Sequence, residues 1–472
     1  MKKNALLIIL VGLLASSACS ATELIQGINF VKGDLIQYSG GSTTPTAGWC
    51  WFQDERAIVD VSNQNDPILM FTGISIDNDN PAEQGDLDLY WQKLISGEAG
   101  HYELYDQFES DDHAVAALWS GPDGRTAAVF ARHGSHSDTY SRISAKGDPS
   151  QWDAPSVYQA QMPPEYEGRE NYNVNPTYTN LLTVGEGKNR RLLDFTRSVG
   201  WNPNFLSSSD HGSTWKYGGR LINSEGRPYL KYTNNLNGSL IHISATEQHP
   251  RDFDNSIYHG VTDGSVLRDS FGSVVDGDLS DQEAIEPTEL SVVYKGGADN
   301  VAWTVDMEVD QDDHPVIAFS VQKNSAGLPV GEGGTDHRYH YAKFDGTSWI
   351  QSEIAYAGTR LYAREDDYTG LMAIDPQNVS RLVISTDADP DTGEPLMSKA
   401  DGKLHYEIFE GESKDNGKTW SWSPLTYNSS VDNIRPVIPN WQSAKRVVLW
   451  MRGTYVSYTN FDTQLVGVIQ QR

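Results

Sequence analysis

The octapeptides SSDHGSTW (residues 208–215) and SKDNGKTW (residues 413–420) share the pattern S-x-D-x-G-x-T-W. This pattern is the Asp-box, a turn between two outer strands in which the Asp side chain bonds backbone amides and the Trp packs below. A weaker copy is FDGTSW (residues 344–349). The same turn at separate places in one chain indicates a molecule built from repeated β units.

The rest of the chain has the pattern of an all-β protein. Short apolar alternations such as RAIVDVS (56–62) and RVVLWMRG (446–453) are separated by turn residues, and long 3.6-residue periodicity is missing. We therefore predict a seven-bladed β-propeller of four-stranded antiparallel blades, with residues 22–46 supplying the strand that closes the ring. The blades are predicted at 48–97, 101–158, 172–223, 226–275, 300–355, 368–427 and 432–470.

The N-terminus predicts export. The stretch MKKNALLIILVGLLASSACSATE (1–23) has two lysines, an apolar run and small residues, which is typical of a secretory signal peptide. We expect a signal peptide over 1–21, a single catalytic propeller domain over 22–472, and a secreted or periplasmic protein. Cys19 offers an alternative, lipid anchoring, although Ser16 stands where such a motif usually has Leu. Cys50 is expected to be a small buried hydrophobic residue.

Composition limits the partners. The 472 residues carry 36 basic and 64 acidic side chains, a formal charge of −28, so nucleic acid and anionic membranes are excluded as partners. No later segment is long and apolar enough to span a membrane, and we expect a monomer. An anionic substrate would require arginines that are concentrated locally against this negative background.

Polar and ionisable residues stand at the starts of the innermost strands of the first four blades. In a propeller these starts meet on one face of the ring, so they predict a functional face. The four starts read QDERAIV (53–59), DDHAVAALW (111–119), NPTYTNLL (175–182) and RPYLKY (227–232).

The second blade places two histidines together. The loop GPDG (121–124) predicts a hairpin that pairs Gly121 with Arg125, and continuation of that register sets His113 opposite His133. Side chains directly opposed across a ladder have Cβ atoms about 4.5–5.5 Å apart. Two such imidazoles cannot both be protonated cheaply, so at least one is expected to be neutral. A neutral imidazole suits either a catalytic base or half of a zinc site.

The third blade follows the same logic. If Val184 pairs with Arg191, then Tyr178 faces Arg197. An arginine beside the phenol lowers the phenol pKa, which makes Tyr178 usable as an acid or base. Arg197 alternatively clamps a carboxylate in bidentate fashion.

Several stretches resemble one known family. GWCWFQDERAIV (48–59), the Asp-boxes, RPYLKY and TEQHPRDFDNSIYHG (246–260) resemble the BNR-repeat propellers that include the ulvan lyases, closest to the shorter of the two propeller-type ulvan lyase families. The resemblance covers nearly the whole mature chain.

The resemblance implies roles for individual residues. His113 and Tyr178 would be the catalytic acid/base pair, His133 a substrate-binding residue and Arg197 the neutraliser of the uronate carboxylate, with Arg190 and Arg191 as alternatives to Arg197. Tyr229 or Tyr232 would line the same cleft.

The implied reaction is β-elimination on ulvan, an anionic sulfated algal polysaccharide, between 3-sulfated rhamnose and glucuronate or iduronate. It needs a neutralised carboxylate, a base and an acid, and no cofactor. Two alternatives stay open: a sialidase-like glycoside hydrolase, which needs three arginines and a Tyr/Glu pair, and a glycan-binding propeller without activity.

Two stretches raise the question of a structural metal. His249 and His259, with His242 nearby, are candidate ligands of a structural zinc, although their spacing matches no strong zinc motif. DADPDTGEP (387–395) begins like a calcium-binding loop, but Ser398 stands where a bidentate Glu is needed. We interpret this stretch as a turn with at most weakly bound calcium.

Overall fold

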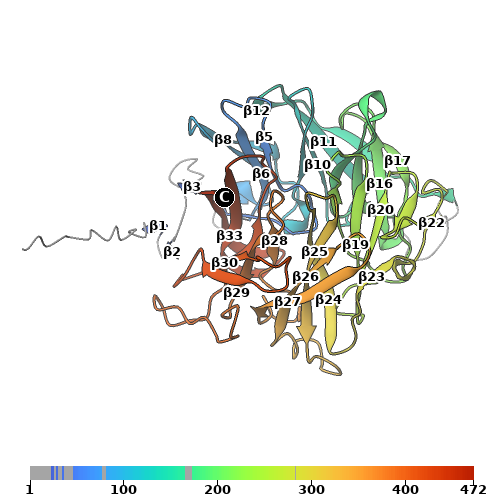
Figure 1. Cartoon of the computed structure of the whole chain (residues 1–472). Coiled ribbons are helices and arrows are strands. Elements are labelled where there is room, and N and C mark those ends of the chain that lie inside the picture. The colour runs from blue at the N-terminus through green and yellow to red at the C-terminus, as the bar shows by residue number, and fades with distance from the viewer. Residues whose placement is uncertain are drawn as a thin grey trace, which may run out of the picture.

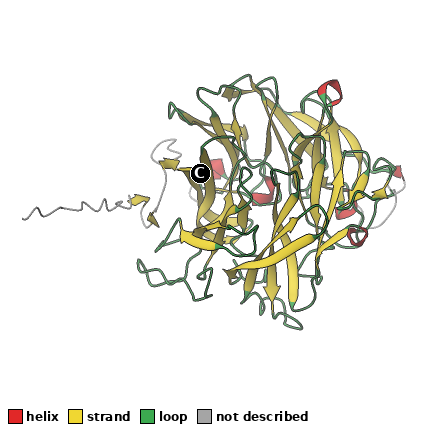
Figure 2. Cartoon of the chain, viewed as in Figure 1, coloured by secondary structure: helices red, strands yellow, loops and turns green. Residues whose placement is uncertain are grey.

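The computed structural model describes residues 23–25, 28–29, 34–36, 46–76, 81–164, 173–281 and 283–472. In these ranges the regular elements are strands, with short 3-10 turns between some of them (Figure 2). The all-β class is thus confirmed. The predicted signal peptide over 1–21, with Cys19, lies outside the described residues. A search of the described residues for a helix that is long and apolar enough to cross a membrane finds none.

The strands of the described ranges form seven antiparallel blades that follow one another around a ring. In Figure 1 the colour passes from blue at β6 (Ile68–Ser75) through green at β16 (Pro203–Ser208) and yellow at β24 (Asn300–Val309) to red at β33 (Lys445–Ser457). The last blade then meets the first, because β34 (Asn460–Gln471) contacts β4 (Ala47–Gly48). From blade 1 through blade 7 the first strands of consecutive blades contact each other, so the first strand is the innermost one. The seven-bladed propeller is confirmed.

Each blade is given from its innermost strand outward. Blade 1 contains β4 (Ala47–Gly48) and β5 (Ala57–Asp60), both paired with β6 (Ile68–Ser75), then β7 (Leu87–Lys93) and β8 (Ala99–Tyr105). Blade 2 contains β9 (Ala117–Ser120), β10 (Thr126–Ala131), β11 (Asp138–Ala145), β12 (Asp148–Trp152) and β13 (Ser156–Gln159). Blade 3 contains β14 (Leu181–Val184), β15 (Arg191–Arg197), β16 (Pro203–Ser208) and β17 (Lys216–Arg220). Blade 4 contains β18 (Leu230–Asn234), β19 (Ile241–Ala245), β20 (Ile257–Thr262), β21 (Leu267–Asp269), β22 (Val274–Asp276) and β23 (Ser291–Tyr294).

Blade 5 contains β24 (Asn300–Val309), β25 (Pro315–Lys323), β26 (His337–Phe344) and β27 (Trp349–Gly358). Blade 6 contains β28 (Met372–Ile374), β29 (Arg381–Thr386), β30 (Glu407–Glu412) and β31 (Ser421–Pro424). Blade 7 contains β32 (Asp432–Val437), β33 (Lys445–Ser457), β34 (Asn460–Gln471) and β3 (Asp34–Ile36). A separate pair near the N-terminus consists of β1 (Glu23–Ile25) and β2 (Ile28–Asn29).

The predicted blade boundaries agree with these sheets to within a few residues except at two places. β23, which lies outside the predicted range 226–275, pairs with β20 and belongs to blade 4. Residues 101–105, predicted to open blade 2, belong to β8, which pairs with β7 and completes blade 1. The predicted closure is confirmed, because β3 pairs with β34 and so joins an N-terminal strand to the last blade. Neighbouring blades cover each other's faces, which explains why a run such as Val447–Met451 is buried on both sides.

The Asp-boxes have the predicted structure. Asp210 Oδ1 accepts a hydrogen bond from the Thr214 amide at 2.9 Å, and Asp415 Oδ1 accepts the same bond from Thr419 at 2.9 Å. The two turns join the third and fourth strands of blades 3 and 6. Asp345, in the weaker copy, accepts from the Ser348 amide at the same position of blade 5. These turns stabilise the outer edge of the ring and lie away from its centre.

Candidate active site

The expected functional residues gather at one end of the innermost strands. His113 lies in a 3-10 turn (η2, Asp112–Ala114) before β9, Tyr178 lies before β14, and Tyr229 directly precedes β18. The second strands run antiparallel, so β10 and β15 end at the same place, where His133 and Arg197 stand. The residues predicted from the strand starts therefore lie close together at one end of the ring.

The hairpin register of blade 2 is confirmed over the ladder. Gly121 donates to the Arg125 carbonyl at 2.7 Å, and the pairs run from Thr126↔Ser120 to Val129↔Ala117. The ladder ends there, and the 3-10 turn carries His113 out of it. The predicted neighbours nevertheless meet, because the imidazoles of His113 and His133 stack with centroids 4.0 Å apart and planes 8° apart.

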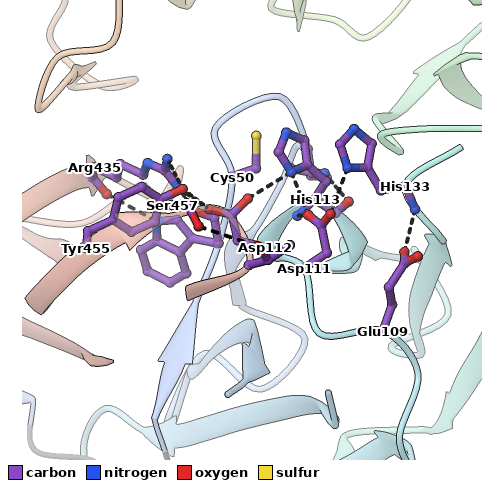
Figure 3. A network of polar contacts seen from close by, with 12 residues as sticks. Cys50, Glu109, Asp111, Asp112, His113, His133, Arg435, Tyr455 and Ser457 are labelled. Carbon is purple, nitrogen blue, oxygen red and sulfur yellow. Dashed lines mark hydrogen bonds and ion pairs between the residues drawn. The ribbon is translucent and has the colours of Figure 1, made fainter. Parts of the chain in front are cut away.

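Asp111 joins the two histidines. Its Oδ1 lies 2.7 Å from Nδ1 of His113 and its Oδ2 lies 2.8 Å from Nδ1 of His133. Figure 3 shows this carboxylate between the two rings. Asp111 also caps the 3-10 turn by accepting the His113 amide. Because both Nδ1 atoms face one carboxylate, both Nε2 atoms are left for other partners.

Asp112 is the second carboxylate on His113, with Oδ1 3.0 Å from Nδ1. Its Oδ2 accepts hydrogen bonds from the Arg435 guanidinium and, at 2.6 Å, from the Tyr455 hydroxyl (Figure 3). Asp112 and Arg435 are almost completely buried. Asp111 and Asp112 thus do more than shape the turn, since both carboxylates face Nδ1 of His113. Arg435, far along the chain, carries no local signal that would have identified it.

The two imidazoles differ in their electrostatic surroundings. Burial acts to lower the pKa of His113, but the surrounding acidic groups outweigh it and hold this pKa well above its ordinary value. Those groups are Cys50, Tyr178, Asp111 and Asp112, and the two aspartates are the anions beside the ring at neutral pH, 2.7 and 3.0 Å from Nδ1. Burial and the charge of His113 lower the pKa of His133, although Asp111 acts in the opposite direction. The shared proton is therefore held more readily by His113 than by His133.

Tyr178 and Arg197 are neighbours in a register shifted by one residue. The pair Val184↔Arg191 is confirmed, but Thr177 rather than Tyr178 bridges to Arg197. Tyr178 has φ 67°, a left-handed conformation that is unusual for a tyrosine. This irregularity turns its ring under the guanidinium, whose central carbon lies 4.8 Å from the ring centroid.

The predicted lowering of the Tyr178 pKa is wrong, because the phenol is buried. Burial, followed by the neighbouring Tyr229, raises the pKa of the Tyr178 phenol well above its ordinary value, and Arg197 offsets this only in part. The phenol therefore holds its proton at neutral pH. A phenol that keeps its proton can donate it as a general acid, but it cannot accept a proton as a general base.

Arg197 is a buried cation without an anionic partner in the described part of the chain. Its exposure is 5%, and its Nε and Nη1 atoms have no hydrogen-bond partner there. The guanidinium lies over the rings of Tyr178, Trp201 and Tyr229 instead. A buried guanidinium with unused donors is costly, so its geometry favours an anionic ligand.

The two candidate tyrosines of RPYLKY have different surroundings. Tyr229 contacts Arg197 and the ring of His249, which places it in the cluster. Tyr232 stacks on Phe195 with centroids 4.6 Å apart, deeper between blades 3 and 4. Both line one small cavity of about 20 Å³, together with Tyr178 and Arg197.

The histidines considered for zinc do not share a site in the structure. His249 contacts Tyr229 and Trp303, whereas His259 lies against His242, with ring nitrogens 3.1 Å apart. Neither His249 nor His259 belongs to a group of three potential metal ligands among the described residues. Burial lowers the pKa of His249 to about 2, an effect that Arg251, Arg227 and Arg197 increase, so His249 is a neutral side chain beside the cluster.

Three groups of potential metal ligands occur in the described ranges. Two of them share His113: Cys50 with Asp112 and His113, and Asp111 with His113 and His133. The third, Asp310 with Asp312 and His314, belongs to the turn between β24 and β25. The buried Cys50 expected from the sequence is confirmed. The stretch 387–395 forms the expected turn, in which Asp389 accepts hydrogen bonds from the amides of Asp391 and Thr392.

Comparison with known proteins places the chain among propellers. The sequence profile described as a BNR repeat-containing family member matches residues 83–357. A solved ulvan lyase, described as a new family of polysaccharide lyase and bound to -[GlcA(1-4)Rha3S]-, has a TM-score of 0.59 at 11% identity, covering 93% of this chain and 96% of its own. A second structure titled as an ulvan lyase of a new polysaccharide lyase family has a TM-score of 0.58 at 11% identity, covering 91% and 96%.

An α-L-arabinofuranosidase of Fusarium graminearum complexed with arabinobiose has a TM-score of 0.42 at 12% identity, covering 75% of this chain and 92% of its own. No curated protein sequence matches the chain. At these identities the structural likeness shows the fold alone.

Proposed function

The chain belongs to the BNR repeat-containing family, and from the geometry of its site we propose that it is a polysaccharide lyase acting on uronate-containing chains. The observation that carries this proposal is Arg197, a buried guanidinium with unused donors beside a protonated phenol and two imidazoles. This combination supplies the three requirements of β-elimination, namely a cation for the carboxylate, an acid and a base.

The reaction follows from these groups. Arg197 pairs with the uronate carboxylate and thereby stabilises the negative charge that develops when the C5 proton leaves. The C5–H electrons form the C4=C5 bond, the C4–O bond breaks, and the departing oxygen takes the proton of Tyr178. The C5 proton passes to the histidine pair, for which the resemblance implies His113 as the acting residue and His133 as a substrate-binding one. Tyr178 then regains a proton from the histidine pair or from water.

We propose ulvan as the substrate, cleaved between 3-sulfated rhamnose and glucuronate or iduronate. The solved ulvan lyase is bound to a saccharide with the repeat GlcA(1-4)Rha3S, and it shares the fold over nearly its full length. Tyr229 and Tyr232 would line the cleft beside Arg197. We further propose that the protein is exported, secreted or periplasmic, and acts as a monomer without a required cofactor.

A sialidase-like hydrolase is the weaker alternative. Arg56, which directly precedes β5, donates to the Cys50 carbonyl at 3.0 Å and lies 3.5 Å from Asp54. Its guanidinium is thus committed within the protein, whereas Arg197 is not. Arg56 is therefore not available to join Arg197 in the set of three arginines that the alternative requires.

The test is product absorbance. Elimination leaves a C4=C5 bond conjugated to the carboxylate, so incubation with ulvan should produce absorbance at the ultraviolet edge. Green-algal, pectic and animal uronate polymers form the substrate panel. New reducing ends without absorbance would identify a hydrolase, and binding to the polymer with neither signal would identify a binding protein; both results contradict the lyase proposal.

Arg197 has a matched control on its own hairpin. Arg197→Gln should lower kcat about 10²–10³-fold because the developing charge loses its counter-ion. Arg190→Gln, an exposed change a few residues earlier, should leave kcat unchanged. Equal losses in the two variants would contradict a role for Arg197 at the carboxylate.

A further inference from the structure

The proposed elimination needs a group that can accept a proton, and two of the three candidates already hold one. Tyr178 is a buried phenol with a raised pKa. Nδ1 of His113 lies between two carboxylates, 2.7 Å from Asp111 and 3.0 Å from Asp112. The pair implied by the resemblance therefore contains two proton donors and no ready acceptor.

The stacking of the histidines decides where the single positive charge resides. Two imidazolium rings stacked 4.0 Å apart would repel each other strongly, because both like charges would lie in a largely buried site. One charge is therefore shared by the pair, and the carboxylates place it on His113. Asp112, itself fixed by Arg435 and Tyr455, faces His113 and not His133.

His133 has the opposite surroundings. Its Nδ1 bonds Asp111 at 2.8 Å, its backbone amide donates to Glu109 at 2.6 Å, and the Tyr458 ring stands edge-on at 5.7 Å. Burial and the charges of His113 and Arg197 act to lower its pKa, and Asp111 acts to raise it. Its side chain is 25% exposed, compared with 7% for His113.

We propose that His133 is the proton acceptor of the elimination, taking the C5 proton on Nε2, while His113 is a permanently charged neighbour. This inference rests on the proposed function and specifies which imidazole acts. Asp111 keeps the proton of neutral His133 on Nδ1, so the lone pair is on Nε2. The C5–H bond breaks, a bond from Nε2 to hydrogen forms, and the electron pair becomes the C4=C5 bond as the C4 oxygen leaves.

The charge that forms on His133 is balanced locally. Asp111 contacts its Nδ1, and the substrate gains negative charge on its carboxylate as the proton leaves. His113 meanwhile prevents premature protonation of His133, because its charge lowers the His133 pKa. The base is thus kept free of protons at neutral pH.

Parallel pH profiles of His133→Gln and His113→Gln test the assignment. His133→Gln should lower kcat on ulvan by about 10²–10⁴-fold at every pH between about 5 and 9. His113→Gln should keep measurable turnover, and its acidic limb should move to higher pH, since His133 loses the cation that lowers its pKa. The opposite pattern, with His113→Gln inactive and His133→Gln altered only in KM, would overturn the proposal.

If both variants are inactive, rescue by added imidazole distinguishes the roles of the two histidines. Added imidazole should restore turnover in His133→Gly, whose cavity opens to solvent, and should not restore it in His113→Gly. Rescue of His113→Gly alone would overturn the proposal, as would rescue of neither. Thermal unfolding of each variant identifies a loss of folding, and absence of ultraviolet absorbance with the wild-type protein would instead reject the proposed function itself.

Discussion

Asp111 shows how one carboxylate sets the state of two side chains. By facing both Nδ1 atoms it fixes the orientation of both rings, and its own pKa is lowered because the interactions with His113 and His133 outweigh its burial. The side chain caps the turn, and its second oxygen reaches His133, 22 residues away.

Asp111→Asn is the change that tests this role. The amide keeps the shape but must present an NH2 group to one Nδ1, which forces that imidazole into the other tautomer. We expect kcat to fall by about 10³-fold or more, with little change in thermal unfolding, as for other buried carboxylates that fix a histidine tautomer. Asp123→Asn, in the hairpin turn of the same blade, is the control and should retain full activity. Unchanged kcat in Asp111→Asn would remove the carboxylate from the mechanism.

Asp194 is a buried carboxyl whose ionisation opposes folding. Oδ1 accepts the Asn180 amide at 3.0 Å, while Oδ2 has no partner among the described residues. Burial raises its pKa to about 8, well above the ordinary 3.8. Because the folded-state pKa is the higher one, the folded protein binds the proton more tightly, and stability is lost as pH rises from about 4 to about 8.

Asp194→Asn should remove that loss. Asparagine keeps the hydrogen bond from the Asn180 backbone amide and cannot ionise, so the variant should gain stability over the wild type as pH rises from 5 to about 8, by up to about 1.4 kcal/mol per pH unit. Urea unfolding at several pH values measures this difference. An exposed control, Asp263→Asn, should follow the wild-type pH dependence. A constant offset between wild type and Asp194→Asn across the range would contradict the prediction.

At the scale of the strands, the hairpin registers followed from local turn chemistry. The left-handed Gly124, with φ 80°, fixes the turn of blade 2, and the predicted pair Ser120↔Thr126 follows from it. The irregularity at Tyr178 could not be predicted in this way, because nothing in NPTYTNLL marks it. It depends on tertiary packing beneath Arg197, which shifts the contact by one residue while leaving Val184↔Arg191 in place.

The Asp-box is the element whose contribution can be measured separately. Asp210 accepts from Ser208 and from both the amide and the hydroxyl of Thr214. Asp210→Ala should therefore lower the free energy of unfolding by about 1 kcal/mol without changing kcat, since the turn lies far from the site. Ser209→Ala, an exposed neighbour, is the control for thermal unfolding. A loss of activity at unchanged stability would show that the turn is more than structural.

At the scale of the whole molecule, the site lies where the ring closes. Arg435 of blade 7 donates to the Trp49 carbonyl, just after β4 of blade 1, and to Asp112, just before blade 2. Asp112, which faces His113, is thus itself held by a residue 323 positions later in the sequence. The blade pattern predicted the ring and its closing strand, but sequence alone gave no sign of this contact, because it depends on closure of the entire circle.

The net charge of the molecule predicts an unusual response to salt. A chain with a formal charge of −28 repels a polyanionic substrate at long range, while Arg197 attracts its carboxylate only at contact. The Debye length falls from about 30 Å at 0.01 M salt to about 10 Å at 0.1 M, so the repulsion is screened first and the buried contact is hardly screened. We therefore expect KM for ulvan to fall several-fold between 10 mM and 200 mM NaCl, with kcat nearly constant. KCl should give the same curve, because screening depends on ionic strength and not on the cation. A KM that rises steadily with salt would mean that long-range attraction, from a basic surface, governs binding instead.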